Sequence, residues 1–240
     1  MTHFSIKFRL AGLILVWSAC TAAIATGVRP DTTILNISEQ DGEAQMGVQN
    51  TENTPMLLNV EIIEMPEDGE TSIFASPSVS RMEPNGKQVV RFLLEKPKSP
   101  LSVQHMKRVS FEGIPGRYEK PGERNQVSMT VRQIIPVVIS PAGLKQDNEP
   151  WKFLTLKNVS DGKLELANPS PYVVRLSAKA VILPGEEALQ ILTRTYILPG
   201  EKISISYDRA EKKEPITGIR IEPASPWGYM DKPFDLNISP

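Results

Sequence analysis

The sequence predicts an all-β protein made of two tandem β-sandwich domains, and three observations lead to this prediction. Apolar and polar residues alternate in short segments, turn-forming residues separate these segments about every ten residues, and a pattern in the first half of the chain recurs in the second. A chain of 240 residues can hold two cores of ordinary size. Its 21 prolines against 15 glycines suit many short strands better than long helices.

The amino terminus predicts an export signal over residues 1–25. Lys7 and Arg9 precede an apolar stretch that ends in a small-x-small pattern, with cleavage expected after Ala25. A retained membrane anchor is the alternative, but the apolar stretch of roughly 16 residues is short for a bilayer that needs about 20. We therefore expect an exported protein with no stable membrane insertion after cleavage.

The only cysteine, Cys20, lies inside this leader. Bulky Trp17 argues against a lipid-attachment signal at Cys20, because such signals usually carry leucine there. Once the leader is removed, the mature protein has neither thiol nor disulfide, although its compartment would allow both. Its stability must then come from packing.

Alternation with a period of two predicts strands with one buried face along the mature chain. The alternating apolar residues are Ala44, Met46 and Val48, then Val109 and Phe111, then Val127, Met129 and Val131, then Ile203 and Ile205, then Ile219 and Ile221. No window of fifteen residues sustains a helical period, so we expect little helix.

An internal repeat indicates two copies of one unit. Asn50 and Asn168 each begin a proline-containing turn that precedes an apolar strand. Pro55 and Pro84 are 29 residues apart, and Pro171 and Pro199 are 28 apart. The turn-rich stretch 140–150 predicts the boundary, which gives two immunoglobulin-like sandwiches over residues 26–141 and 142–240.

Composition argues against several classes of function. The 27 basic and 28 acidic residues leave no basic bias for nucleic acid. His105 is the only histidine after the leader, no nucleophile, zinc or phosphate-loop motif is present, and we expect neither an enzyme nor a metal or other cofactor. His105 is expected at the surface where a strand begins, and the acidic residues of 64–70 are expected to form a solvated loop.

Four segments resemble the periplasmic pilus (fimbrial) assembly chaperones. In chain order they are residues 77–92, 108–115, 127–141 and 164–172, and the resemblance runs from about Val28 to the end of the chain. The resemblance implies two immunoglobulin-like sandwiches set at an angle with a cleft between them. It also implies a periplasmic location, pilin subunits as partners, and an outer-membrane usher that receives them.

The resemblance further implies that a strand near the end of the first domain is lent to an incomplete pilin. The matching residues are 127–135, in which Val127, Met129, Val131 and Gln133 share one face. For an anonymous strand, the simpler interpretation is that these residues face their own core. The resemblance favours the pilin-binding role.

The chain departs from this family at its carboxylate anchor. Relatives carry an arginine on the first strand and a lysine near the end of the lent strand, positions that match Thr33 or Ile34 and Pro136 here. Symmetric pairing of strands 107–114 and 127–136 places Arg108 opposite Pro136. Arg108 is therefore the predicted replacement anchor, with Lys107 and Arg132 as lesser candidates.

Two other functions are alternatives. A structural fimbrial subunit or adhesin is the chief alternative, but two repeated sandwiches differ from the single incomplete domain expected of such a subunit. An exported enzyme has little support because catalytic groups are scarce.

Overall fold

The computed structural model describes residues 27–69, 71–116, 130–160, 162–185, 187–207 and 215–239. The predicted leader lies outside these ranges. Within them the chain forms strands β1 to β19 and one short 3-10 helix, η1 (Pro150–Phe153), which confirms the all-β prediction. No helix in the described ranges is long and apolar enough to cross a membrane.

The first sandwich contains β1 to β9. Their bounds are β1 (Val28–Pro30), β2 (Leu35–Ser38), β3 (Glu43–Asn50), β4 (Met56–Ile63), β5 (Ile73–Ser76), β6 (Val79–Met82), β7 (Lys87–Leu94), β8 (His105–Pro115) and β9 (Arg132–Ser140). One sheet has the order β1-β3-β7-β5, and the other has the order β2-β9-β8-β4-β6. All pairs are antiparallel except the parallel pair of β2 and β9.

The alternation in the sequence gives each of these sheets a buried face. Met46 lies opposite Val90 across β3 and β7, and both side chains are buried. Phe92 and Phe111 come from the two facing sheets and pack edge to face, with ring centroids 6.2 Å apart. The core of the first sandwich therefore lies between its two sheets, as the period of two predicts.

The second sandwich contains β10 to β19. Their bounds are β10 (Thr155–Ser160), β11 (Lys163–Ala167), β12 (Val174–Leu176), β13 (Lys179–Leu183), β14 (Ala188–Gln190), β15 (Tyr196–Ile197), β16 (Lys202–Ser206), β17 (Gly218–Ile221), β18 (Pro223–Ala224) and β19 (Phe234–Asn237). The sheet orders are β10-β11-β16, β15-β12-β18 and β14-β13-β17-β19. Trp151 of η1 is buried in the core that these sheets enclose.

The internal repeat has a structural basis in two buried asparagines. The Asn50 amide donates hydrogen bonds to the backbone oxygens of Thr54 and Glu83. The Asn168 amide donates to the backbone oxygens of Tyr172, Ile197 and Leu198. Each asparagine thus ties the end of one strand to the proline turn that precedes a later strand, once in each sandwich.

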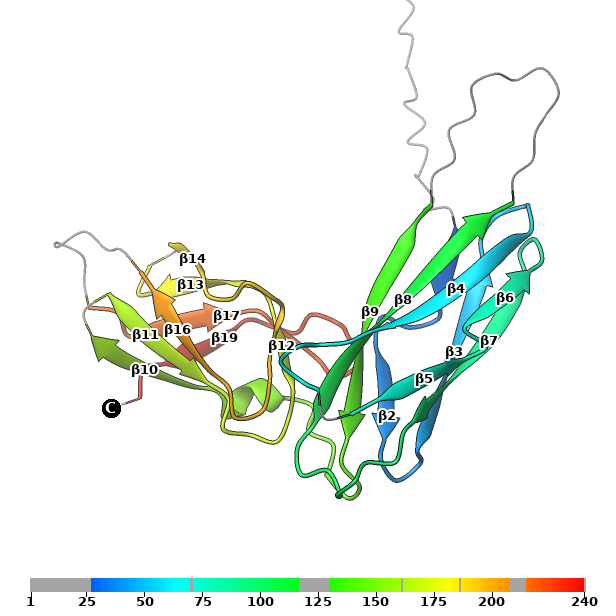
Figure 1. The fold of residues 1–240 in the computed structure, drawn as a ribbon. Helices are drawn as coiled ribbons and strands as arrows, with labels where there is room; N and C mark the ends of the chain where they lie inside the picture. Colours follow the sequence, from blue (N-terminus) through cyan, green and yellow to red (C-terminus); the bar gives the residue numbers. More distant parts are fainter. Residues whose placement is uncertain are drawn as a thin grey trace, which may run out of the picture.

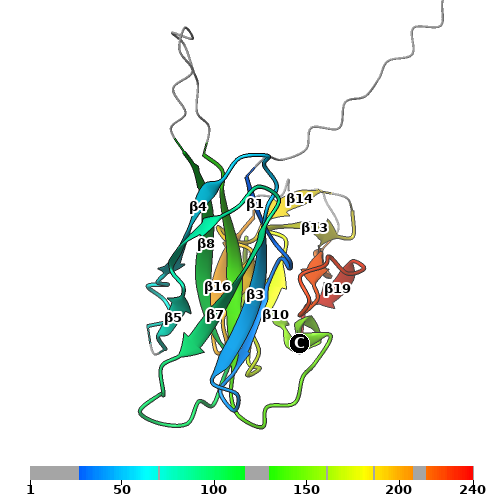
Figure 2. The same cartoon turned by 90° about the vertical axis from the view of Figure 1, so that its right-hand side faces the viewer.

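Figure 1 shows the two sandwiches side by side, with their strands running in different directions. The β8 and β9 side of the first sandwich faces the second. Figure 2 looks from the side of the first sandwich, with β3 and β7 toward the viewer and the second sandwich behind. The outer face of the five-stranded sheet is therefore the one that borders the second sandwich.

Candidate functional site

A cluster of buried side chains joins the two sandwiches. Met65 and Met106 come from the first sandwich, and Val173, Tyr196 and Leu198 come from the second. Met106 lies on β8 between His105 and Lys107, and its side chain is on the outer face of the sheet because alternate residues of a strand point to opposite faces. This apolar contact fixes where the cleft between the sandwiches lies.

Asp68 anchors the loop that supplies Met65, residues 64–69, to β8. One oxygen of its buried carboxylate lies 2.6 Å from Nδ1 of His105. The other accepts a hydrogen bond of 2.6 Å from the backbone N–H of Met106. The expectation of a solvated acidic loop is therefore wrong at Asp68, because this carboxylate is the acceptor for groups at the start of β8.

Lys107 also anchors the 64–69 loop to β8. Its side chain is fully buried, and its ammonium donates to the backbone oxygen of Asp68 at 2.5 Å and to the Glu64 carboxylate at 2.7 Å. His105 is also buried, with 6% of its surface exposed, so the prediction of a surface histidine is wrong. Both residues lie an even number of steps along β8 from the core residues Val109 and Phe111. Alternate residues of a strand point to the same face, so the sequence indicated that these side chains point inward.

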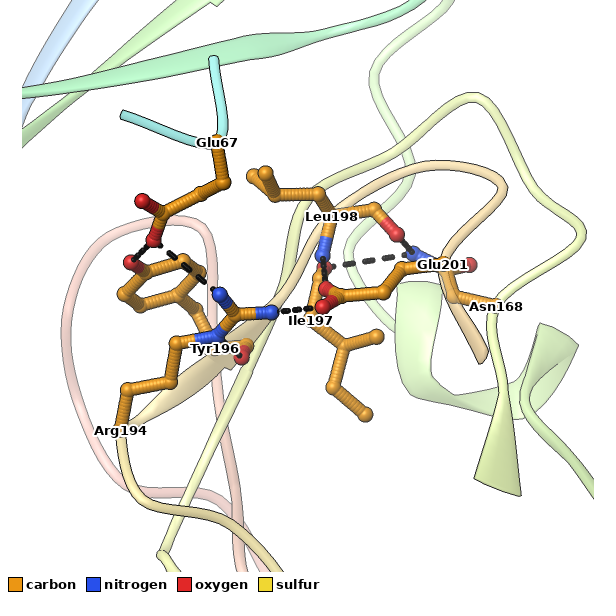
Figure 3. Close-up of polar contacts among 7 residues, drawn as sticks. All are labelled: Glu67, Asn168, Arg194, Tyr196, Ile197, Leu198 and Glu201. Atoms are coloured by element: carbon orange, nitrogen blue, oxygen red, sulfur yellow. Dashed lines mark hydrogen bonds and ion pairs between the residues drawn. The ribbon is translucent and has the colours of Figure 1, made fainter. Parts of the chain in front are cut away.

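Glu67, from the same loop, connects the two sandwiches (Figure 3). Its carboxylate accepts a hydrogen bond from the hydroxyl of Tyr196 and pairs with Nη1 of Arg194 at 3.1 Å. Arg194 also pairs with Glu201, and that carboxylate accepts a hydrogen bond from the backbone N–H of Leu198 at 2.9 Å. These contacts form a polar network beside the apolar cluster.

The network shifts the pKa values of its two central groups in opposite directions. Burial, together with the hydrogen bond to the Glu67 carboxylate, raises the pKa of Tyr196 to about 12. The hydrogen bond from Tyr196 is the main cause that lowers the pKa of Glu67 below its ordinary value, and Arg194 adds to this. A neutral phenol facing an ionised carboxylate is therefore the stable arrangement at neutral pH.

Two arginines flank the Tyr196 ring. The guanidinium carbon of Arg194 lies 4.6 Å from the ring centroid, and that of Arg108 lies 5.6 Å from it. Both distances are within the range of cation–π attraction. Arg108 thus extends from β8 across the cleft toward the second sandwich.

One edge of β9 is only partly covered. Along one side β9 pairs with β8 from Arg132 to Ile139, and along the other it pairs with β2 only from Val137 to Ser140. Among the described residues, no strand pairs with Arg132–Pro136 on that second side. Pro136 has no N–H to offer, and proline in a sheet is tolerated where a strand is at an edge.

The strand register predicted for Arg108 is confirmed, whereas its role as an anchor stays a prediction. Arg108 lies opposite Pro136, in the pairing that the symmetric hairpin predicted. Its side chain is half-buried in the cleft. Lys107 points to the other face and is hydrogen-bonded, while Arg132 pairs with Glu112 at the far end of β9. Of the three candidates, only Arg108 lies beside the second sandwich.

The predicted pilin-binding residues fall partly within the described ranges. Val127 and Met129 lie outside them. Val131 and Gln133 are half-buried, and the Gln133 amide donates a hydrogen bond of 2.7 Å to the backbone oxygen of Val28. Within the described ranges β9 begins at Arg132, five residues after the predicted start of the strand.

A cavity of about 490 Å³ lies between the sandwiches. Its walls include Ile34 and Val138 from the first sandwich and Arg175, Ser225 and Trp227 from the second. Trp227 is 55% exposed, so one wall is open to solvent. Arg108 is not among the residues that line this cavity.

Sequence reasoning missed Glu67, Arg194, Tyr196 and Arg175. The partners of Glu67 are more than 120 residues away in the chain. Short-range patterns carry no signal for contacts of this kind. The flanking of Tyr196 by two arginines arises only when the sandwiches meet.

Comparisons with known proteins agree with this geometry. Residues 27–145 match the family model described as the pili and flagellar-assembly chaperone, PapD N-terminal domain. The uncharacterized fimbrial chaperone YhcA of Escherichia coli (strain K12) is 36% identical over 216 residues, which cover 90% of this chain and 92% of the relative.

Solved structures share the fold. The SafB chaperone, in the structure of the Salmonella enterica SafA pilin in complex with it, superposes with a TM-score of 0.72 at 17% identity, over 90% of this chain and 99% of that one. The Escherichia coli chaperone DraB superposes with a TM-score of 0.70 at 16% identity, over 89% and 99%. These likenesses confirm two immunoglobulin-like sandwiches, and the YhcA match extends over both of them. The chain belongs to the fimbrial (pilus-assembly) chaperone family.

Proposed function

We propose that the mature chain binds pilus subunits in the periplasm by strand addition along β9, prevents their aggregation, and delivers them to an outer-membrane usher. The observation that supports this proposal is the unpaired edge of β9 from Arg132 to Pro136 in the described part of the chain. A partner strand can form main-chain hydrogen bonds along such an edge. The division into domains at residue 141, and action by binding rather than catalysis, belong to the same proposal.

Side chains that precede this edge or lie on it would set the register. Val127, Met129, Val131 and Gln133 alternate along the chain, so they would enter successive positions of a groove in the partner. Burial of each apolar member is worth about 1.5–3 kcal/mol before the costs of ordering and association are subtracted. A binding energy of this size suits a chaperone that must later release its subunit.

The test is a pair of variants co-expressed with a pilus subunit. Met129→Glu places a charge in the proposed groove-filling position and should reduce recovery of soluble subunit from the periplasm. Val89→Glu is the control, because Val89 is 52% exposed on β7 of the other sheet. Recovery that is equal for parent, Met129→Glu and Val89→Glu, with all three chaperones folded, would contradict strand addition at this site.

Arg108 is the proposed anchor for the carboxyl terminus of the subunit. Its register opposite Pro136 puts a forked donor where relatives of this family carry their lysine, and a guanidinium matches a carboxylate in geometry. Arg108→Ala should weaken binding of a peptide that ends in the subunit's free carboxylate. Unchanged affinity for that peptide would remove Arg108 from the proposal.

A role as a structural fimbrial subunit or adhesin is not favoured. The chain belongs to the chaperone family along most of its length, and each sandwich encloses a core of its own. Such a role would also require an explanation of the unpaired β9 edge other than strand addition to a partner.

A further inference from the structure

We infer that Ile134, on the unpaired edge of β9, is a specificity-determining residue that selects a β-branched or aromatic side chain on the strand that a partner adds. The inference rests on the proposed function and deepens it, because it names a chemical preference of the same edge. The alternating residues from Val127 to Gln133 would fill the partner's groove on one face of β9, whereas Ile134 lies on the other face.

Ile134 points outward from the five-stranded sheet. Its neighbour Ile135 is buried in the core of the first sandwich, and successive residues of a strand point to opposite faces. This outer face borders the second sandwich (Figure 1), yet 51% of the Ile134 surface is exposed. The docked second sandwich therefore leaves Ile134 uncovered.

The side chains around Ile134 on this face are polar. Across β8 its partner is Ser110, and beyond Ser110 on β4 lies Glu61. Two residues back along β9, Arg132 pairs with Glu112 of β8 at 3.0 Å. Among the described residues, the adjacent strand thus offers Ile134 no large apolar partner directly opposite. Only a strand on the unpaired side of β9 could supply one.

An exposed isoleucine at this place differs from the usual protection of a sheet edge. Natural edge strands commonly carry charged residues or proline, which discourage pairing with another chain. The unpaired stretch has such residues at its ends, Arg132 and Pro136, and has Ile134 at its centre. A single exposed apolar residue elsewhere on a surface needs no explanation. Here the unpaired backbone beside it favours a partner strand.

A strand paired with this edge would place one side chain directly opposite Ile134. The Cβ atoms of opposite residues in adjacent strands are about 4.5–5.5 Å apart, which is close enough for contact. Opposite residues share a face whether the added strand runs parallel or antiparallel to β9. A β-branched or aromatic residue would bury apolar surface against Ile134, whereas a charged residue would lose water without gaining a partner.

Arg132 adds a charge preference two positions away on the same face. Its guanidinium is partly neutralised by Glu112 but remains about half exposed. A basic residue of the added strand opposite Arg132 would be repelled, and an acidic residue would be favoured. The strand that fits this edge is therefore extended, with an apolar outward residue opposite Ile134 and no basic residue opposite Arg132.

The test uses the full mature chain and a labelled nine-residue peptide of alternating valine and threonine. A set of related peptides carries glutamate at each position in turn. Dissociation constants are measured by fluorescence anisotropy for the parent, Ile134→Lys and Ile134→Thr. Val159→Lys is the matched control, because it adds the same charge at a residue that is 63% exposed on β10 of the second sandwich.

Glutamate at the peptide position opposite Ile134 should weaken binding to the parent by about twofold to fivefold, the size of a cross-strand pair. Ile134→Lys should reverse this preference, so that glutamate at that position strengthens binding by a similar factor. Ile134→Thr keeps a β-branched residue on the strand and should reduce the preference without reversing it. Val159→Lys should affect every peptide alike. A peptide that binds in two registers would show the reversal at positions two residues apart, which also supports the inference.

The inference is overturned if the parent binds the peptides and no position responds to Ile134→Lys differently from Val159→Lys. Strand addition along β9 would stand in that case, because binding itself would remain. If the parent binds none of the peptides, strand addition is contradicted, and selection by Ile134 fails with it. Arg132→Glu should make glutamate unfavourable at a position two residues from the one that responds to Ile134, and an unchanged preference there would remove Arg132 from the inference.

Discussion

Replacing Tyr196 with phenylalanine removes one hydroxyl from the contact between the sandwiches and leaves the ring in place. The lost interaction is the hydrogen bond to the Glu67 carboxylate. Hydrogen bonds to charged groups contribute about 1.5–3 kcal/mol. Glu67 keeps its ion pair with Arg194, so we expect the lower end of that range. The equilibrium between docked and separated sandwiches would then shift by about tenfold.

The pH dependence of the variant gives a second test. Because the pKa of Tyr196 is raised to about 12 in the folded protein, the phenol stabilises the fold fully below its ordinary pKa of about 10. That contribution is lost as pH rises from about 10 to 12, and it amounts to at most about 2.7 kcal/mol for two pKa units. The phenylalanine variant should lack this alkaline loss.

Glu67 acts in the opposite direction. Its pKa is lowered in the fold, so its contribution is present above its ordinary pKa and is lost as pH falls through the lowered value. Part of this acid-side loss should remain in the variant, because Arg194 still pairs with Glu67.

Urea unfolding followed by tryptophan fluorescence measures how the substitution changes the unfolding free energy of the second sandwich. Without the predicted leader the remaining tryptophans are Trp151 and Trp227, both in that sandwich. Tyr172→Phe is the matched control, since the Tyr172 hydroxyl makes an exposed hydrogen bond to the backbone oxygen of Lys145. The reasoning is refuted if Tyr196→Phe has the midpoint and the alkaline profile of the parent.

Three further substitutions test the contacts that position the cleft. Asn168→Ala removes buried hydrogen bonds worth about 0.5–1.5 kcal/mol each, so it should lower the unfolding free energy by about 3–5 kcal/mol. The fluorescence of Trp151 measures this change. An equal effect of Asn50→Ala on that signal would argue against independent unfolding of the two sandwiches. Asp68→Ala removes the carboxylate that contacts His105 and the backbone N–H of Met106 at the start of β8. Amide hydrogen exchange in the 64–69 loop should then become faster. Exchange as slow as in the parent would contradict the anchoring role of Asp68. Gly218→Ala would place a Cβ 2.4 Å from the backbone oxygen of Leu236, so it should separate β17 from β19 and lower the thermal midpoint; an unchanged midpoint would refute that close approach.

The repeat and the register of one hairpin could be predicted because both depend on local patterns. Asn50 and Asn168 satisfy nearby backbone groups in each sandwich, and such turns have a sequence signature. Arg108 faces Pro136 because an antiparallel hairpin fixes its register from the centre of its loop. The prediction of a surface His105 was wrong, because contacts with the distant 64–69 loop determine its burial.

The alternation of apolar residues specifies strands with one buried face, and together with the internal repeat it determined that this chain folds as two sandwiches. Turn-forming residues about every ten positions determined where the strands are separated. Only the tertiary structure decided which polar groups meet between the sandwiches. Glu67 meets Tyr196 and Arg194 because docking of two separately encoded cores brings together residues that no local pattern relates.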